Sequence, residues 1–136
     1  MIFLLDTDIL IDVALRRMPY ATAAGDLLDL LEQRPGTAWI AWHTLSNFYY
    51  LVSPTRGRSN TKNFLVDLVR FVNVAQTTTK SFLLAARLQM KDFEDALQVA
   101  AAVACEAEVI VTRNIRDYTH SPVRAVTPES ARHEFF

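Results

Sequence analysis

Acidic side chains stand beside short apolar runs at several separated places in this 136-residue sequence. Asp6 and Asp8 follow the run "IFLL", and Asp92 and Asp95 open the apolar stretch "DFEDALQVAAAV". Asp117 comes shortly after a further apolar run, "EVIVT". Carboxylates that converge from separate segments are the ligands that Mg²⁺ and Mn²⁺ prefer. The pattern favours a metal site for hydrolysis, where one cation stabilises charge and a second also activates water.

Other catalytic chemistries have less support in the sequence. His43, His120 and His133 are scattered without the spacing of a zinc site, and Cys105 is the single cysteine. Cys105 has no partner for an intrachain disulfide, and we expect it to pack in the core. The phosphate-loop pattern GxxxxGK[ST], the dinucleotide pattern GxGxxG and the serine-elbow pattern GxSxG are all absent.

The elements that must position the acids alternate between strand and helix. Apolar runs predict strands at residues 2–5, 37–41, 72–76, 108–112 and 123–127. Helical spacing predicts helices at residues 8–17, 20–34, 42–53, 61–71, 79–89, 92–107 and 128–135, with a polar loop at 54–60 and a turn at 113–118. This alternation is typical of an α/β protein with a doubly wound parallel sheet, and the length fits one domain over residues 1–136.

In such a sheet, ligands bind at the carboxyl ends of the strands near a topological switch point. Asp6 and Asp8 directly follow the first strand, and Asn114 and Asp117 follow the fourth. The helix that begins at Asp92 leads into that fourth strand, so we expect its start to face the same edge of the sheet.

Each acid also has a possible structural role. Asp8 and Asp92 stand where helix N-caps belong, whereas Asp6, which ends an apolar strand, has no capping role of its own. Asp12 and Asp26 fall within helices, where we expect them to face solvent.

The composition is that of a globular protein, with 51% hydrophobic residues, 21% charged residues and a net charge of -1. No apolar stretch reaches the roughly 18 residues that span a bilayer, and the start "MIFLLDTDIL" has no basic leader. We therefore expect a cytoplasmic protein without a membrane partner.

Four segments of the chain resemble the motifs of PIN-domain ribonucleases, in particular the VapC-type toxins of bacterial toxin–antitoxin pairs. They are "FLLDTDILID", "WHTLSNFYYL", "KDFEDALQVAAAV" and "IVTRNIRDY", in the order and at about the spacing of that family, and the similarity extends to "AVTPESA" near the end. The resemblance implies a PIN-like three-layer α/β/α fold with a central, mainly parallel sheet of about five strands. It also implies RNA cleavage with Mg²⁺ or Mn²⁺, a homodimer, and an antitoxin protein as partner.

The resemblance carries specific residues over. The first family aspartate falls on Asp6, the third acid on Asp95, and the fourth region on Thr112, Asn114 and Asp117. It implies catalytic roles for Asp6, Asp95, Asp117 and Thr112, and a metal site of Asp6, Asp8, Asp95 and Asp117 with Asp92, Asn47 and Asn114 as further candidates.

Asn47 is a departure, because the family usually has a glutamate at this position. An amide oxygen can ligate Mg²⁺ but brings no negative charge, so the site loses part of what lowers the pKa of a bound water. Two acids compensate for this missing negative charge. Asp8 stands where the family often has an amide, and Asp92 lies one turn from Asp95.

For the mechanism, we expect an activated water to attack the phosphodiester in line, with Thr112 orienting a carboxylate or the water. Arg58, Lys62 and Arg113 are the candidate contacts to the RNA backbone. The aromatic residues 48–50 either stack on bases or pack in the core or at a dimer interface.

Three functions follow from these observations. The first is a metal-dependent endoribonuclease that acts as the toxin of a toxin–antitoxin pair. The second, which Asn47 keeps open, is a catalytically degenerate PIN-like module that binds RNA or protein without cleaving. The third, an aspartate- and Mg²⁺-dependent phosphatase-like hydrolase, has less support because no glycine-rich phosphate loop is present.

Overall fold

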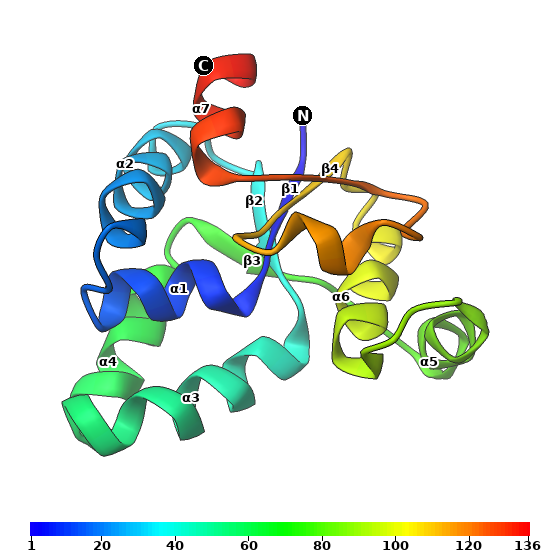
Figure 1. The fold of residues 1–136 in the computed structure, drawn as a ribbon. Coiled ribbons are helices and arrows are strands. Elements are labelled where there is room, and N and C mark those ends of the chain that lie inside the picture. Colours follow the sequence, from blue (N-terminus) through cyan, green and yellow to red (C-terminus); the bar gives the residue numbers. More distant parts are fainter.

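A five-stranded sheet with helices on both faces forms the centre of the molecule in the computed structural model, which describes residues 1–136 (Figure 1). The strands are β1 (Phe3–Leu5), β2 (Ala38–Ile40), β3 (Val72–Val74), β4 (Val109–Val111) and β5 (Arg124–Val126). The helices are α1 (Thr7–Ala14), α2 (Tyr20–Glu32), α3 (Trp42–Arg56), α4 (Arg58–Leu68), α5 (Thr79–Arg87), α6 (Phe93–Ala104) and α7 (Pro128–Phe135), with a 3₁₀ turn η1 (Ile115–Tyr118). None of these helices has the length and apolarity needed to cross a membrane. The predicted three-layer α/β/α fold is confirmed.

The sheet is parallel throughout, and its strand order is β3-β2-β1-β4-β5. Leu4 in the central strand pairs with Trp39 on one side and with Ile110 on the other. The chain moves from β1 to β2 and β3 on one side and returns to add β4 and β5 on the other. The strand order therefore reverses between β1 and β4, and the residues that follow these two strands share one edge of the sheet.

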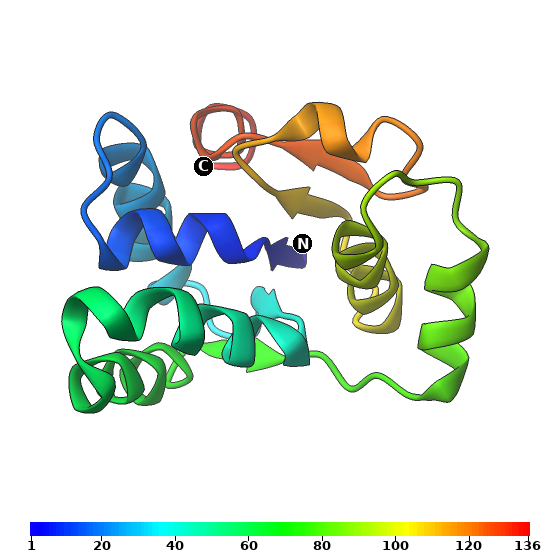
Figure 2. The same ribbon diagram turned by 60° about the horizontal axis from the view of Figure 1, so that its bottom comes forward.

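The central strand is buried on both faces, as its all-apolar sequence predicts. Phe3 and Leu5 belong to the large core beneath α1, α2 and α7, whereas Leu4 belongs to a second core with Ile110 and with Val99 of α6. All three residues of β1 are fully buried. Burial of a side chain of this size contributes about 1.5–3 kcal/mol, so β1 is firmly held between the two helical layers visible in Figure 2.

Helix α6 joins the sheet closely because its inner positions are small. Ala101 and Ala102 pack in the core with Leu4, and Ala96 and Ala100 pack against Ala85 of α5. The helix ends at Ala104, and the next residue, Cys105, lies half-buried at the edge of the second core rather than within it. This tight packing fixes the first turn of α6 relative to β1.

The predicted loop at residues 54–60 is wrong, because α3 continues through Pro54 to Arg56 and α4 begins at Arg58. Pro54 lies in the last turn of α3, where its missing N–H removes only one backbone bond and the ring is exposed to solvent. The chain turns at Gly57, whose φ of 85° is readily adopted only by glycine. The Gly57 N–H closes α3 by donating to the Ser53 carbonyl at 2.8 Å.

Candidate functional site

Asp6, the first residue after β1, caps helix α1. Its backbone is extended, with φ of -68° and ψ of 152°, and its Oδ1 accepts a hydrogen bond from the Thr7 N–H at 2.7 Å. Asp8 lies inside the first turn. The predictions that Asp8 caps this helix and that Asp6 has no capping role are therefore both wrong, because the helix begins at Thr7 rather than after Asp8.

The second oxygen of Asp6 accepts two further hydrogen bonds inside the protein. Thr112 Oγ1 and the Tyr118 hydroxyl each donate to Asp6 Oδ2 at 2.9 Å. The Asp6 side chain is buried, and that burial, together with the negative charge of Glu94, raises the pKa of Asp6 to about 6, although the hydrogen bonds lower it in part. Asp6 is thus an oriented carboxylate whose charge is only partly compensated.

Asp8 lies beside Asp6 and faces the loop after β4. Its Oδ2 accepts hydrogen bonds from the Arg113 N–H and from Asn114 Nδ2, each at 3.2 Å, and lies 3.3 Å from Thr112 Oγ1. Its Oδ1 is buried and has no hydrogen-bond partner. Burial and then the charge of Asp6 raise the pKa of Asp8 to about 7. An unpartnered buried carboxylate oxygen is costly unless a proton or a cation satisfies it.

Asp95, in the first turn of α6, faces these acids from the other helical layer. Its Oδ1 lies 3.4 Å from the Tyr118 hydroxyl. Burial, then the negative charge of Asp6 and of neighbouring acids, raises the pKa of Asp95 to about 7. Asp117 in η1 is exposed and lines a pocket of about 450 Å³ together with Asp95. The predicted N-cap of α6 is confirmed, because Asp92 accepts a hydrogen bond from the Glu94 N–H at 2.8 Å.

Tyr118 stands between the two helical layers of the site and was missed by the sequence prediction. Its ring is buried in the second core, and its hydroxyl lies between Asp6 and Asp95. Burial and then the charges of these two acids raise the pKa of the Tyr118 hydroxyl, so it remains a hydrogen-bond donor. Only its place at the end of "RNIRDY", one residue after Asp117, could have drawn attention to it.

Asp12 was predicted to face solvent, and this prediction is wrong. Its side chain is only 1% exposed and accepts two hydrogen bonds from Arg113, at 2.9 Å from Nε and 3.2 Å from Nη2. The Arg113 guanidinium also lies 4.2 Å from the centre of the Tyr20 ring. Arg113 therefore anchors the loop after β4 to α1. This anchoring also keeps the backbone N–H of Arg113 within hydrogen-bond distance of Asp8. The other acid of that prediction, Asp26, is partly exposed and pairs with Arg132 at 3.1 Å.

Asn47 lies on α3, half-buried, and its side chain makes no hydrogen bond to the acids. One turn earlier on the same helix, Thr44 Oγ1 lies 2.9 Å from Thr7 Oγ1, and Gln98 Nε2 donates to both hydroxyls at 3.1 Å. These three buried side chains join α1, α3 and α6, and Thr7 directly follows Asp6. Nearer the surface, His43 and Glu94 approach to 3.0 Å and join α3 to α6 again.

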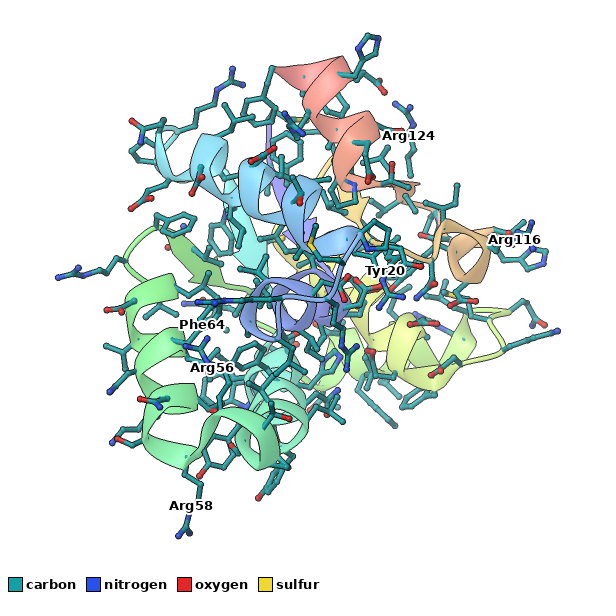
Figure 3. All side chains as sticks on the ribbon, turned by 60° about the vertical axis from the view of Figure 1, so that its left-hand side comes forward. Tyr20, Arg56, Arg58, Phe64, Arg116 and Arg124 are labelled. Atoms are coloured by element: carbon teal, nitrogen blue, oxygen red, sulfur yellow. The ribbon has the colours of Figure 1, made fainter.

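The remaining predicted RNA contacts lie elsewhere. Arg58 and Lys62 are exposed on the first turns of α4, and Figure 3 shows Arg58 at the bottom of the molecule and Arg116 at its right-hand side. Of the aromatic residues 48–50, Phe48 is buried and stacks on Phe64 with ring centres 5.0 Å apart, whereas Tyr50 is 73% exposed. The structure brings together Asp6, Asp8, Asp95, Thr112 and Asn114, and leaves Arg58 and Lys62 apart from them.

The donor set suits a hard divalent cation. Burial, and then the negative charge of Asp6, raise the pKa values of Asp8 and Asp95. One oxygen of Asp8 is buried without a hydrogen-bond partner. No group of three or more His, Cys, Asp or Glu side chains already converges as a metal site. This arrangement fits Mg²⁺ better than zinc, because Mg²⁺ keeps several waters and is commonly held by one or two carboxylates.

The PIN domain family matches residues 3–116. No relative is found among curated protein sequences. The structure of VapBC2 from Rickettsia felis, bound to a DNA fragment from its promoter, is similar with a TM-score of 0.73 at 19% identity, covering 93% of this chain and 98% of that one.

Two further solved structures share the fold. VapBC-1 from nontypeable Haemophilus influenzae gives a TM-score of 0.70 at 15% identity, covering 95% of this chain and 99% of that one. VapC20 from Mycobacterium tuberculosis, a toxin that cleaves the sarcin-ricin loop, gives 0.64 at 15% identity, covering 98% and 96%. Because the family match spans most of the residues that build the sheet and the site, this chain belongs to the PIN domain family.

Proposed function

We propose that this protein is a metal-dependent endoribonuclease that acts as the toxin of a toxin–antitoxin pair. The observation that carries the proposal is that Asp6, Asp8 and Asp95 are linked through shared hydrogen-bond donors at the point where the strand order reverses. Thr112 contacts both Asp6 and Asp8, and Tyr118 contacts both Asp6 and Asp95. Burial of these carboxylates, together with the repulsion that Asp6 exerts on Asp8 and Asp95, favours binding of a cation at this place. Membership of the PIN domain family and the similarity to VapC20, a toxin that cleaves RNA at the sarcin-ricin loop, agree with this chemistry.

Asp6, Asp8 and Asp95 would hold Mg²⁺ or Mn²⁺, with Asp117 and Asn114 on the open side. When bound, such a cation supplies charge stabilisation at the phosphoryl oxygens and lowers the pKa of water. The chain's own contribution is orientation. Thr112 and Tyr118 fix the Asp6 carboxylate through two hydrogen bonds of 2.9 Å, so its remaining lone pairs point in a set direction.

The first test is cleavage of a labelled single-stranded RNA. We expect cleavage with millimolar Mn²⁺ or Mg²⁺ and none with excess EDTA. Asp95→Asn, which keeps the side-chain volume and removes the charge, should abolish cleavage while circular dichroism shows a folded protein. Undiminished cleavage by this variant would contradict the proposal.

The partner part of the proposal rests on the VapBC structures, whose fold this chain shares. We propose an antitoxin protein as a partner and a homodimer as the free state. Light scattering on the purified chain gives the oligomeric state. Co-expression with the product of an adjacent reading frame tests for a stable complex that suppresses RNA cleavage.

A second candidate is a PIN-domain module that binds RNA or protein without cleaving it. Asn47 favours this second function. It is an amide where the family usually has an acid, and its side chain forms no hydrogen bond to the acids of the site. Ligand binding raises the melting temperature by mass action, so a nuclease should be stabilised by Mn²⁺. A module that has lost its metal site should show no such shift.

A further inference from the structure

A pocket of about 450 Å³ opens beside Asp95 and combines an acidic wall with a cationic rim. Residues 89–92 before α6, Asp95 in the first turn of α6, and four residues in and after η1 line it, namely Arg116, Asp117, Thr119 and His120. Its acids are Asp92, Asp95 and Asp117, and its cationic or titratable side chains are Lys91, Arg116 and His120. The volume falls in the range of about 300–1,000 Å³ typical of pockets that take small organic ligands.

The cations of this rim are not used by the protein itself. Lys91 and Arg116 are exposed, and neither approaches a carboxylate closely enough to form an ion pair, although three acids line the same pocket. Figure 3 shows the Arg116 side chain extending outward from η1. Arg113, three residues earlier, is by contrast held by Asp12 and by the Tyr20 ring. Lys91 and Arg116 therefore remain free to contact an anion.

We infer that this pocket binds the sugar-phosphate backbone of single-stranded RNA next to the cleaved bond, with Lys91 and Arg116 as its phosphate contacts. The inference rests on the proposed nuclease function and assigns substrate contacts to that site. Phosphate oxygens pair with guanidinium and ammonium groups, and such contacts position the strand without reading its sequence. The acidic wall keeps the phosphate on the rim side, because direct contact between phosphate and carboxylate is repulsive.

This assignment differs from the one drawn from the sequence. Arg113 is engaged within the protein, and Arg58 and Lys62 lie on α4, where Figure 3 places Arg58 far from η1. Lys91 and Arg116 are instead separated by 25 positions in the sequence and meet at one pocket only because β4 brings η1 beside the start of α6. No local pattern in the sequence would pair them.

The test uses fluorescein-labelled oligouridylate of about twelve nucleotides. Binding is measured by anisotropy in EDTA, so that metal-dependent cleavage does not interfere, over a series of salt concentrations. The variants are Lys91→Ala with Arg116→Ala, the charge-keeping pair Lys91→Arg with Arg116→Lys, and Arg58→Ala with Lys62→Ala. Arg70→Ala is the matched control, because Arg70 is an exposed arginine two residues before β3, the edge strand on the far side of the sheet from β4.

We expect the Lys91/Arg116 alanine pair to weaken binding at least about tenfold and to reduce the slope of log K against log salt by about 1.4, since each phosphate contact on a single strand contributes about 0.7. The charge-keeping pair should retain most of the binding, and Arg70→Ala should bind like the unchanged protein. Wild-type binding by the Lys91/Arg116 alanine pair overturns the inference. Loss confined to the Arg58/Lys62 pair also overturns it.

A parallel cleavage assay with Mn²⁺ separates this inference from the proposed function. If the unchanged protein cleaves RNA and the Lys91/Arg116 alanine pair binds and cleaves equally well, the pocket assignment fails and the nuclease proposal stands. If binding depends on Arg116 but no cleavage occurs, the nuclease proposal fails and the pocket assignment stands. A protein that neither binds nor cleaves RNA contradicts both.

Discussion

Helices α1 and α6 both begin with an aspartate N-cap and carry a second aspartate in the first turn, yet the pairs are used differently. In α1 the cap, Asp6, is buried and is also a central acid of the site. In α6 the cap, Asp92, is exposed, and the inner residue Asp95 faces the site. The same local feature thus places both aspartates of α1 in the site, but only the inner aspartate of α6.

The difference arises from what precedes each helix. Asp6 directly follows β1, whose residues are fully buried, and its N–H donates to the Val111 carbonyl at 2.9 Å, so it cannot turn outward. Asp92 follows the surface segment at Lys91 and is free to stay in solvent. Connection to a buried strand, and not capping geometry, decides whether a capping carboxylate enters the site.

We expect the largest difference in RNA cleavage when the two N-cap residues, Asp6 and Asp92, are each replaced by asparagine, which can also cap a helix. Asp6→Asn should reduce RNA cleavage at least about a hundredfold. Loss of a group that only hydrogen-bonds to a metal ligand already costs about 10–100-fold, and Asp6 would contact the cation itself. Asp92→Asn should reduce it at most about threefold. Cleavage rates with Mn²⁺ at saturating RNA measure both. Equal losses in the two variants would remove the distinction.

The fold was predictable from the sequence because the patterns of apolar residues that indicate its strands and helices are local. The apolar run before Asp6 predicts a buried strand, and the helical spacing after Asp92 predicts α6. The loop before α4 was mispredicted because Pro54 is tolerated in the last turn of a helix, where little hydrogen bonding is lost.

The acids of the candidate site were predictable from the sequence, but the hydrogen bonds that hold them in place were not. Asp6 and Asp95 follow from strand ends and family motifs. Tyr118 and the Asp12–Arg113 pair do not, because their partners are 112 and 101 positions away along the chain. Such contacts depend on how the sheet places β1 beside β4, which the residue types alone do not specify.

The acids of α1 should make the metal-free protein less stable as the pH rises. Asp6 and Asp8 have folded-state pKa values of about 6 and about 7, above their usual 3.8. The folded protein therefore binds more protons than the unfolded chain between about pH 4 and pH 7, and stability falls across this window. We expect the melting temperature in EDTA to drop by at least about 5 °C between pH 5 and pH 8.

Added Mn²⁺ should recover much of that loss at pH 8 and little of it at pH 5, because protonated carboxyls bind the cation poorly. Differential scanning fluorimetry across the pH series measures both effects. In Asp6→Asn the fall with pH should be shallower, whereas Asp92→Asn should keep it. A melting temperature that stays level from pH 5 to pH 8 would show that the folded protein does not raise the pKa values of Asp6 and Asp8.

Tyr118→Phe tests how far the Tyr118 hydroxyl orients the Asp6 carboxylate, because it removes that hydrogen bond and leaves the capping hydrogen bond between Asp6 and Thr7. The ring stays in the core, and only the hydroxyl that donates to Asp6 Oδ2 is removed. We expect about tenfold weaker Mn²⁺ binding, because outer partners orient a metal ligand. Isothermal titration calorimetry measures it, and Tyr50→Phe, at a tyrosine that is 73% exposed, is the control. Unchanged Mn²⁺ affinity would mean that Thr112 alone orients Asp6.

The smallest effect concerns the exposed cap of α6, where two substitutions separate capping from charge. Asp92→Ala removes both the hydrogen bond to the Glu94 N–H and a negative charge that helps raise the pKa of Asp95. It should lower the free energy of unfolding by about 1 kcal/mol, whereas Asp92→Asn should cost less because asparagine also caps. Both variants should move the acidic limb of the pH profile of cleavage to lower pH, since Asp95 then ionises more readily. If only the alanine variant moves the profile, Asp92 acts on Asp95 through the helix start and not through its charge.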